Sequence, residues 1–595
     1  MRWLLKTVQP TEVERLADAL LQDSRLKNSA PNAVLLARLL LTRGISDMES
    51  AAPFLAPSVS QLHSPYLMAG MKAAVDRLEA AIERKEHILI YGDYDVDGTT
   101  AIVILKTAIE LCGGTADFHV PHRIRDGYGM RDDVIERAAE AGIRLIISVD
   151  MGIRSFAPAE TAQRLGVDLI VTDHQLPGQD GVPRALAVVN PNQDGCEYPC
   201  KALCGAGVAF KLAQGLLERQ RAGSDLTRVL HSFMKVVAIA TVADAVPLIG
   251  ENRVFARLGL EGLRTAVNPG LKALLEVAQL GGRPLTSGDV AFRVAPRINA
   301  AGRMDVAREV VELFTGKDPT RAAEIARKLD QLNADRQEEE RRILEAIQTR
   351  IEEDASLREA FCMVIDGEGW HRGVIGITAT RVVERYCRPA LVISREGDEA
   401  HGSGRSIPAF HLLNALESCR ELFTRYGGHA HAVGFSLPSA QVPELRQRLD
   451  ACARVSLTTA DFEPALGIDA ELPLGEITPE LLHLLSLLEP YGVGNSQPVF
   501  GSKGVRLTAP PRTLKEKHVK LKFAGNDGPG HNDWRRALVF EATGWRMAER
   551  VAQEQLLPGD TLDVAYTLDY NDHPQFGGIE LTLKDFQREQ LSANR

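Results

Sequence analysis

Acidic residues follow several of the most apolar stretches of the sequence, at spacings that suit metal binding. The run HILIYGD leads into a D-x-D-x-D pattern, and the runs RLIISVD and DLIVTD also end in aspartate, the second followed by histidine. Carboxylate oxygens with one imidazole suit Mn²⁺ or Mg²⁺ better than Zn²⁺. We therefore predict a site for hard divalent cations, built from Asp93, Asp95, Asp97, Asp150, Asp173 and His174.

These residues stand at the ends of short apolar runs that helical segments separate. The runs at 87–93, 144–150, 168–173 and 185–190 are continuous rather than alternating in hydrophobicity, which favours a parallel sheet buried on both faces. Ligands bind at the carboxyl ends of such strands, so the acidic residues should meet at one edge. One aspartate after a strand is usually a turn or cap residue, but three such strand ends favour a metal site.

The chain of 595 residues is long enough for several domains. Changes in pattern predict an α/β protein with five regions. An N-terminal helical region (1–75) precedes a parallel-sheet catalytic domain (76–317), a long connecting helix (318–356) and a smaller α/β domain (357–455). Short alternating strands over 456–595 are typical of a small β-barrel of the OB-fold type.

Composition and charge narrow the classes of function. With 45% hydrophobic residues, no apolar run of about 18 residues and no export signal, we expect a cytoplasmic protein that binds no membrane. The net charge of −10 taken alone argues against a polyanionic ligand. However, residues 501–536 contain nine lysines or arginines against three acidic residues, which predicts a phosphate-rich ligand there.

Four motifs, in order, carry a resemblance to a known family. YGDYDVDGTTA, SVDMGI, VTDHQLPG and TVADAVPL resemble the motifs of the DHH phosphoesterases, in which a DHH-associated domain follows the catalytic domain. APRINAAGRM, GSGRS and YGGHAHAVGF resemble, more narrowly, the family's bacterial single-strand-specific 5′→3′ exonucleases. The resemblance covers nearly the whole chain and implies release of nucleoside 5′-monophosphates from single-stranded DNA, in recombination and repair.

The resemblance also implies two bound cations, manganese or magnesium. Two cations close together lower the pKa of a shared water and direct it at a phosphodiester. Asp150 is expected to bridge the two ions. Asp244 ends an apolar helical stretch, and only the resemblance singles it out. The implied metal ligands are Asp93, Asp95, Asp97, Asp150, His174 and Asp244.

Further residues are expected to bind the DNA strand with its 5′ end. Arginine suits a terminal phosphate because its planar fork binds two oxygens. The resemblance implies that Arg303, Ser403 and Arg405 bind the 5′-phosphate, and Arg123 or Arg125 could add a contact. In HVKLKF the lysines share the outer face of a strand, which favours DNA binding there. The other expected DNA contacts are Tyr128, which could stack on a base, His429, Arg512, Lys517, Lys520 and Lys522.

Gln175 departs from the family pattern, which has a second histidine after His174. A glutamine amide can donate a hydrogen bond to a phosphoryl oxygen, but it carries no charge. A charged donor contributes about 1.5–3 kcal/mol against about 1 kcal/mol for a neutral one. We therefore expect metal binding and catalysis to be retained, at a reduced rate that Gln175→His would raise.

Two other functions compete with this prediction. Some members of the family act on short oligonucleotides or cyclic dinucleotides, but the extra C-terminal strands argue against that activity here. Others are non-enzymatic DNA-binding scaffolds, which the complete set of expected metal ligands argues against. The resemblance further implies a single-strand-binding protein and a helicase as partners, and we expect a monomer.

Overall fold

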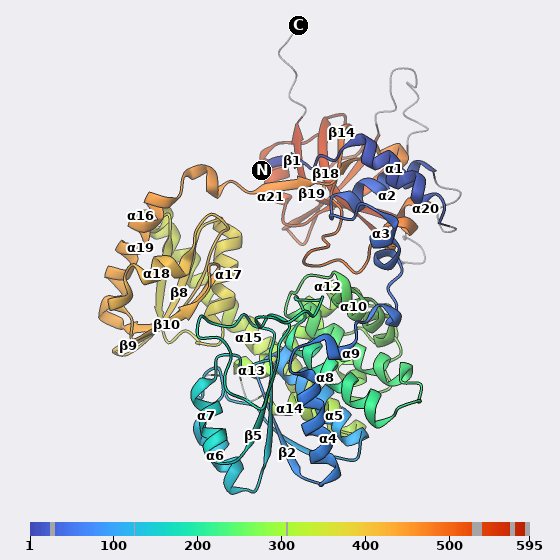
Figure 1. The fold of residues 1–595 in the computed structure, drawn as a ribbon. Helices are drawn as coiled ribbons and strands as arrows, with labels where there is room; N and C mark the ends of the chain where they lie inside the picture. The colour runs from blue at the N-terminus through green and yellow to red at the C-terminus, as the bar shows by residue number, and fades with distance from the viewer. Residues whose placement is uncertain (24–29, 124, 305–306, 526–537, 572–577, 589–595) are drawn as a thin grey trace. The chain divides into compact units, whose positions relative to one another are not determined.

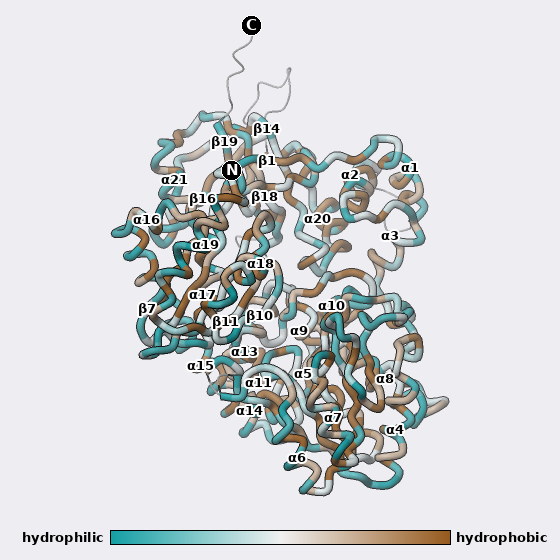
Figure 2. The backbone as a smooth tube through the Cα atoms, turned by 60° about the vertical axis from the view of Figure 1, so that its left-hand side comes forward, coloured by the Kyte–Doolittle hydropathy of each residue, from teal (hydrophilic) through white to brown (hydrophobic). Residues whose placement is uncertain are grey.

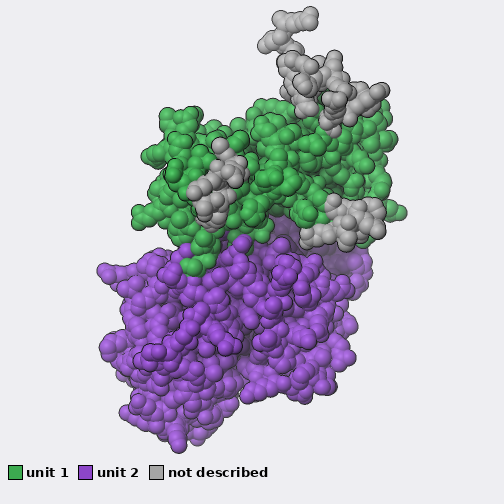
Figure 3. Space-filling model, turned by 90° about the vertical axis from the view of Figure 1, so that its right-hand side faces the viewer, with its two compact units in different colours: residues 1–58, 465–595 green, residues 59–464 purple. Residues whose placement is uncertain are grey.

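The computed structural model describes residues 1–23, 30–123, 125–304, 307–525, 538–571 and 578–588 (Figure 1). The chain forms two compact units, coloured separately in Figure 3. One unit comprises Val59–Pro464, and the other combines Met1–Ser58 with Ala465–Arg595. Among the described residues, every helix is too short or too polar to cross a lipid bilayer.

The parallel sheet predicted from the apolar runs is confirmed, with one further strand. Its order is β3-β2-β4-β5-β6, and all of its pairings are parallel. The residues that end β2, β4 and β5 lie side by side, because Gly92 pairs with Val149 and Val149 with Thr172. The strands are β2 (His87–Gly92), β3 (Thr115–His119), β4 (Leu145–Val149), β5 (Asp168–Thr172) and β6 (Ala187–Val189).

Helices cover both faces of this sheet, which explains why its strands are continuously apolar (Figure 1). One face packs against α4 (Met71–Glu83), α5 (Val96–Leu111) and α8 (Gly205–Gln220). The other face packs against α6 (Asp132–Glu140) and α7 (Phe156–Arg164). The hydrophobic character of α5 and α8 is visible in Figure 2. The same core extends to α9 (Thr227–Ala243), α10 (Gly250–Leu263), α11 (Pro269–Val277), α13 (Ala295–Met304) and α14 (Arg308–Thr315).

The predicted connecting helix is α15 (Pro319–Glu353), which begins after the cap residue Asp318. Its first half contributes Ile325 and Leu329 to the core of the parallel-sheet region. Its second half contributes Ile343 and Ile347 to a different core, which lies under the next sheet. One helix thus connects two hydrophobic cores within the unit.

That next sheet belongs to the smaller α/β region and has the order β10-β11-β9-β8-β7. Its strands are β7 (Met363–Glu368), β8 (Ala390–Glu396), β9 (Glu399–Arg405), β10 (Arg425–Gly428) and β11 (Ala432–Pro438). Only β7 and β8 pair in parallel, and the remaining pairs are antiparallel. Helices α17 (Ile375–Tyr386) and α19 (Val442–Ser456) pack against it.

The C-terminal strands close into a ring, in agreement with the predicted OB-fold. The pairings run β14-β18-β19-β17-β16 and return to β14, and a short strand, β15 (Arg512–Leu514), extends β16. The ring strands are β14 (Phe500–Leu507), β16 (His518–Ala524), β17 (Val539–Gly544), β18 (Thr561–Asn571) and β19 (Gly578–Arg588).

The first 58 residues share their hydrophobic core with this barrel. Leu16, Leu20 and Leu36 belong to the same cluster as Phe500 and Phe586. These leucines lie on α1 (Pro10–Leu20) and α2 (Ala30–Leu41), and α3 (Met48–Leu55) adds to the cluster. Strand β1 (Arg2–Leu5) also pairs in parallel with β12 (Ala465–Ile468).

Candidate metal centre and DNA interface

The strand ends bring the predicted metal ligands to one edge of the parallel sheet. Asp93 follows β2 directly, and Asp95 caps α5 by accepting a 3.0 Å hydrogen bond from the Gly98 N–H. Asp97 lies in the first turn of that helix. Asp150 follows β4 with a left-handed φ of 59°. Asp93, Asp97 and Asp150 are buried, as expected for ligands rather than for surface turn residues.

The ligand atoms form two groups that share one residue. Oxygens of Asp97 and Asp150 and a ring nitrogen of His174 lie within 4.8 Å of one another. Oxygens of Asp93, Asp95 and Asp150 form a second group within the same limit. Asp150 belongs to both groups. A carboxylate that would bind two ions must be shared in this way.

Asp244 is brought to the same place from a different part of the chain. It ends α9, and its Oδ2 lies 3.9 Å from Nε2 of His174. Nε2 of His174 also lies 3.2 Å from Oδ1 of Asp150 and 3.8 Å from Oδ2 of Asp97. All six predicted ligands are therefore gathered at one site.

The electrostatics of the cluster favour the binding of cations. Burial and neighbouring carboxylates raise the pKa values of Asp93, Asp95 and Asp150 above the usual range. Burial alone would lower the pKa of His174, but the charges of neighbouring aspartates, Asp97 and Asp244 foremost, together raise that pKa. Ionised carboxylates this close together need positive charge between them, and hard divalent cations fit the oxygen-rich donor set.

The N-terminus of α8 closes the cluster from one side. The Gly205 N–H donates to Oδ2 of Asp97 at 2.6 Å, and the Ala206 N–H donates to Oδ1 at 2.7 Å. A side chain at residue 205 would place its Cβ 2.5 Å from the Cβ of Asp150. Glycine is therefore required there, and the helix end holds Asp97 in place.

Asp173, which the sequence pattern grouped with the metal ligands, instead binds backbone N–H groups. Its buried carboxylate accepts hydrogen bonds from the N–H groups of Ile153, His174 and Gln175 at 2.9, 2.7 and 3.1 Å. It therefore fixes the backbone that carries His174. The Nε2 of Gln175 points toward Tyr128 and donates to its hydroxyl at 2.6 Å.

Arginines from three regions of the unit gather near the carboxylates. Arg303 on α13, Arg405 on β9 and Arg123 on the loop after β3 are close enough for their charges to interact. Burial, followed by the charges of Arg123 and Arg336, lowers the pKa of Arg303 to about 9. Burial and Arg123 also lower the pKa of Arg405.

Arg303 and Arg405 donate hydrogen bonds to uncharged acceptors. Arg303 donates to the Gly373 carbonyl at 3.0 Å, and Arg405 donates to the Ser403 hydroxyl at 3.1 Å. Arg123 lies over the ring of Tyr94, 5.0 Å from its centroid. Guanidinium groups that repel each other and have only neutral partners would be stabilised by a bound phosphate. This agrees with the predicted 5′-phosphate site of Arg303, Ser403 and Arg405. Arg123, rather than the exposed Arg125, is the loop arginine in this cluster.

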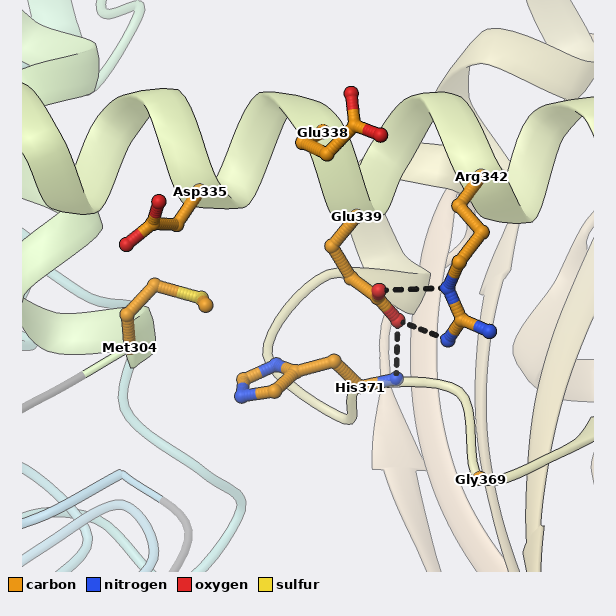
Figure 4. A pocket seen from close by; sticks show the side chains of 7 residues that line it. All are labelled: Met304, Asp335, Glu338, Glu339, Arg342, Gly369 and His371. Carbon is orange, nitrogen blue, oxygen red and sulfur yellow. Dashed lines mark hydrogen bonds and ion pairs between the residues drawn. The ribbon is translucent and has the colours of Figure 1, made fainter.

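A pocket of about 440 Å³ lies between α15 and the loop after β7 (Figure 4). Glu339 pairs with Arg342 at 2.7 Å and accepts a 3.3 Å hydrogen bond from the His371 N–H, which holds the loop against α15. The same loop presents the Gly373 carbonyl to Arg303. The pocket thus supports the phosphate-binding region without containing a predicted site residue. Its lining residues are Met304, Asp335, Glu338, Glu339, Arg342, Gly369 and His371.

His429, the remaining predicted contact in this unit, is exposed between β10 and β11. Its N–H donates to the Ala432 carbonyl at 2.9 Å. Burial, then His431 and Arg405, lowers the pKa of His429, which places it near the arginine cluster.

The predicted DNA contacts of the barrel differ in how accessible their charges are. Lys520 forms an ion pair with Glu541 on the neighbouring strand β17, and Lys522 lies opposite Glu541 in the register. Arg512 and Lys517 are exposed at the hairpin of β15 and β16. Exposed Trp545, which no local sequence pattern marks as a DNA contact, packs against His518 at the same end.

Without divalent cations, the thermal stability of the protein should fall as the pH rises. Burial and the charge of Asp97 raise the pKa of Asp244 to about 8, whereas the pKa of an aspartate in the unfolded chain is about 3.9. The folded state then binds more protons than the unfolded state, so stability declines from about pH 4 to about pH 8. Melting temperatures in EDTA should show this decline, and Mn²⁺ should oppose it. Asp244→Asn should flatten the EDTA profile, and a rising wild-type profile would contradict the prediction.

Three family models match successive parts of the chain. The DHH family N-terminal domain matches residues 87–241, the DHHA1 domain matches residues 359–454, and the RecJ OB domain matches residues 468–585. These matches cover the metal centre except for Asp244, together with the arginine-bearing β9 and the barrel.

Named relatives match nearly the whole chain. The single-stranded-DNA-specific exonuclease RecJ of Dickeya dadantii is 36% identical over 94% of this chain and 97% of its own length. RecJ of Bacillus subtilis is 34% identical over 98% of this chain and 70% of its own length. The crystal structure of Thermus thermophilus RecJ with Mn²⁺ is 28% identical and has a TM-score of 0.81 over 99% of this chain and 79% of that chain. The corresponding Mg²⁺ complex has a TM-score of 0.75, with 26% identity over 99% of this chain and 78% of that chain. The chain therefore belongs to the RecJ family.

Proposed function

We propose that this protein is a metal-dependent exonuclease that degrades single-stranded DNA from the 5′ end to nucleoside 5′-monophosphates. The observation that carries the proposal is the pair of ligand groups that share Asp150, at the sheet edge where the arginines also gather. Membership of the RecJ family supports the same activity. We place the activity in DNA recombination and repair.

The side chains of the site have separate tasks in this proposal. Asp93, Asp95, Asp97, Asp150, His174 and Asp244 would hold two Mn²⁺ or Mg²⁺ ions. When bound, these ions supply a water of lowered pKa and neutralise charge on the phosphoryl oxygens. Arg303, Ser403 and Arg405 hold the terminal phosphate and so set the position of the first phosphodiester bond.

In this proposal, the predicted regions of the chain have different tasks in binding and cleaving the DNA strand. Residues 76–317 hold the metal ions, and residues 357–455 complete the phosphate site across the connecting helix 318–356. Residues 456–595 form the barrel and hold the downstream strand, since exposed cations and an aromatic side chain are typical of single-strand binding. We further propose that the protein acts as a monomer in the cytoplasm, beside a single-strand-binding protein and a helicase.

Digestion of a long single strand tests the proposed function directly. A strand with a 5′-phosphate and a label at each end should release labelled mononucleotide first from its 5′ end, with Mn²⁺ present and not with EDTA. A duplex of the same sequence should resist digestion. Release from the 3′ end, or activity confined to dinucleotides, would contradict the proposal.

Arg405→Ala should remove the preference for a 5′-phosphate. Loss of a charged hydrogen bond costs about 1.5–3 kcal/mol, so KM for a 5′-phosphorylated strand should rise about 10- to 100-fold. KM for the 5′-hydroxyl strand should change little, because that strand lacks the partner group. Arg425→Ala is a suitable control, since Arg425 is an exposed arginine on β10 of the same sheet. Equal losses on both strands would contradict the assigned role.

A further inference from the structure

The loop between β3 and α6 holds Tyr128 beside the metal-binding carboxylates. Gly127 and Gly129 flank it with φ values of 79° and 100°, and a Cβ on either would meet no atom within 4 Å. These glycines serve the backbone turn rather than close packing. Asp126 closes the loop, since its carboxylate accepts from the His122 N–H at 2.8 Å. Residues 126–129 therefore present Tyr128 in a defined backbone conformation.

Gln175 fixes the polar end of Tyr128. Its Nε2 donates to the Tyr128 hydroxyl at 2.6 Å, and that hydroxyl lies 3.5 Å from the backbone oxygen of Asp150. Tyr128 nevertheless remains accessible to solvent, because the residue is 46% exposed. The hydroxyl of Tyr128 is thus held in place, while nearly half of the residue is exposed to solvent.

Gln175 is itself fixed on both sides of its backbone. Its N–H donates to Oδ1 of Asp173 at 3.1 Å, and its carbonyl accepts from Nδ2 of Asn190 at 2.9 Å. The same oxygen of Asp173 accepts from the N–H of His174. One buried carboxylate therefore sets the position of a metal ligand and, through Gln175, of the tyrosine hydroxyl.

We propose that Gln175 is a positioning residue, which holds Tyr128 as a platform for the base of the nucleotide at the metal centre. This role replaces the contact with a phosphoryl oxygen that the sequence pattern predicted for Gln175, because its amide donates to the Tyr128 hydroxyl instead. The inference rests on the proposed function, because the ligand is single-stranded DNA. Aromatic rings stack on every base, so a fixed ring adds affinity without sequence preference. A ring that is ordered before binding loses less conformational freedom when the strand binds. This role requires a hydrogen-bond donor, which the amide of Gln175 provides.

Two conservative substitutions and their combination test the pair. Gln175→Met keeps the length of the side chain and removes the donor, and Tyr128→Phe keeps the ring and removes the hydroxyl. Each should raise Kd and KM for a 5′-phosphorylated strand about threefold to tenfold, with kcat within about twofold of wild type. The double variant should be no worse than either single variant, because both remove the same hydrogen bond. Kd is measured by anisotropy in EDTA, so it does not depend on turnover.

A modified strand and a second tyrosine provide the controls. With an abasic first nucleotide, the platform has no base to contact, so both substitutions should lose their effect. Tyr66→Phe is the matched control, since Tyr66 is 38% exposed and its hydroxyl is held by the Gly215 carbonyl at 2.9 Å. Tyr66→Phe should leave Kd and KM unchanged.

Other results would overturn the inference. Multiplicative effects in the double variant would mean that the two residues act independently. A fall in kcat with unchanged KM in Gln175→Met, or a rise in kcat in Gln175→His, would place residue 175 on the scissile phosphate. Failure of the wild type to hydrolyse DNA would instead overturn the proposed function, because the anisotropy measurements do not require hydrolysis.

Discussion

Asp150→Asn is expected to lower the rate of DNA hydrolysis about a thousandfold or more, and to raise the melting temperature of the metal-free protein. Asp150 is the carboxylate that both ligand groups share, so its loss affects both ion positions. Asparagine has nearly the same shape and tolerates the left-handed φ of 59°, so the fold should not be strained.

The expected gain in stability follows from the electrostatics of the cluster. Burial, and then the charges of Asp97 and Asp95, raise the pKa of Asp150 well above its usual range. Without cations, the ionised carboxylate destabilises the folded state, and a neutral amide removes that cost. Melting temperatures in EDTA should therefore rise by a few degrees at about pH 8, where the cluster of the wild type carries more negative charge than at acidic pH.

A second aspartate on the same sheet serves as the control. Asp117 lies on the edge strand β3, where its 73% exposed side chain pairs with His87 at 2.8 Å. Asp117→Asn should leave both the hydrolysis rate and the melting temperature near those of wild type. If Asp150→Asn kept a tenth of the wild-type rate with Mn²⁺, the assignment of Asp150 as the shared ligand would be wrong.

A protein consisting of residues 59–464 is expected to hydrolyse short oligonucleotides while binding long single strands about a hundredfold more weakly. This unit contains the metal ligands and the arginine cluster, together with the hydrophobic cores beneath them. The removed unit contains the barrel with Arg512, Lys517 and Trp545. The measurements are kcat/KM on a phosphorylated trinucleotide and the affinity for a strand of about 40 nucleotides at two salt concentrations.

The place of the cut decides whether this experiment is informative. Removing residues 465–595 alone would leave Leu16, Leu20 and Leu36 without the barrel core that buries them. That protein should aggregate, which would be mistaken for loss of strand binding. If residues 59–464 bound the long strand as tightly as the full chain, the strand-binding surface would lie outside the barrel.

The metal centre was largely predictable because its residues follow strands with a strong local pattern. Continuous apolar runs identified β2, β4 and β5, and the rule for parallel sheets placed Asp93, Asp150 and His174 together. Strand β3 was not predicted, because an edge strand is only partly buried and its residues are not continuously apolar. Asp244 required the family resemblance, since its position depends on how α9 packs rather than on any local pattern.

Contacts between distant segments were beyond the reach of sequence patterns. The alternation in HVKLKF predicted which face of β16 carries Lys520, but the ion pair with Glu541 depends on the register between two strands. The hydrogen bond between Gln175 and Tyr128 likewise joins two loops through tertiary packing. The pairing of residues 1–58 with residues 465–595 could not be predicted either, because no local feature of the N-terminal helices identifies the barrel as their partner.

That last pairing affects how the chain can fold on the ribosome. The helices of residues 1–58 emerge first, yet the strands that complete their core follow only after residue 465. At a synthesis rate of roughly 5–20 residues per second, these helices wait about 20–80 seconds for their partners. The intervening residues 59–464 can meanwhile fold as a unit of their own. The nascent chain thus exposes an unpaired apolar surface through most of its synthesis, and this stage is where chaperone binding would have its greatest effect on yield.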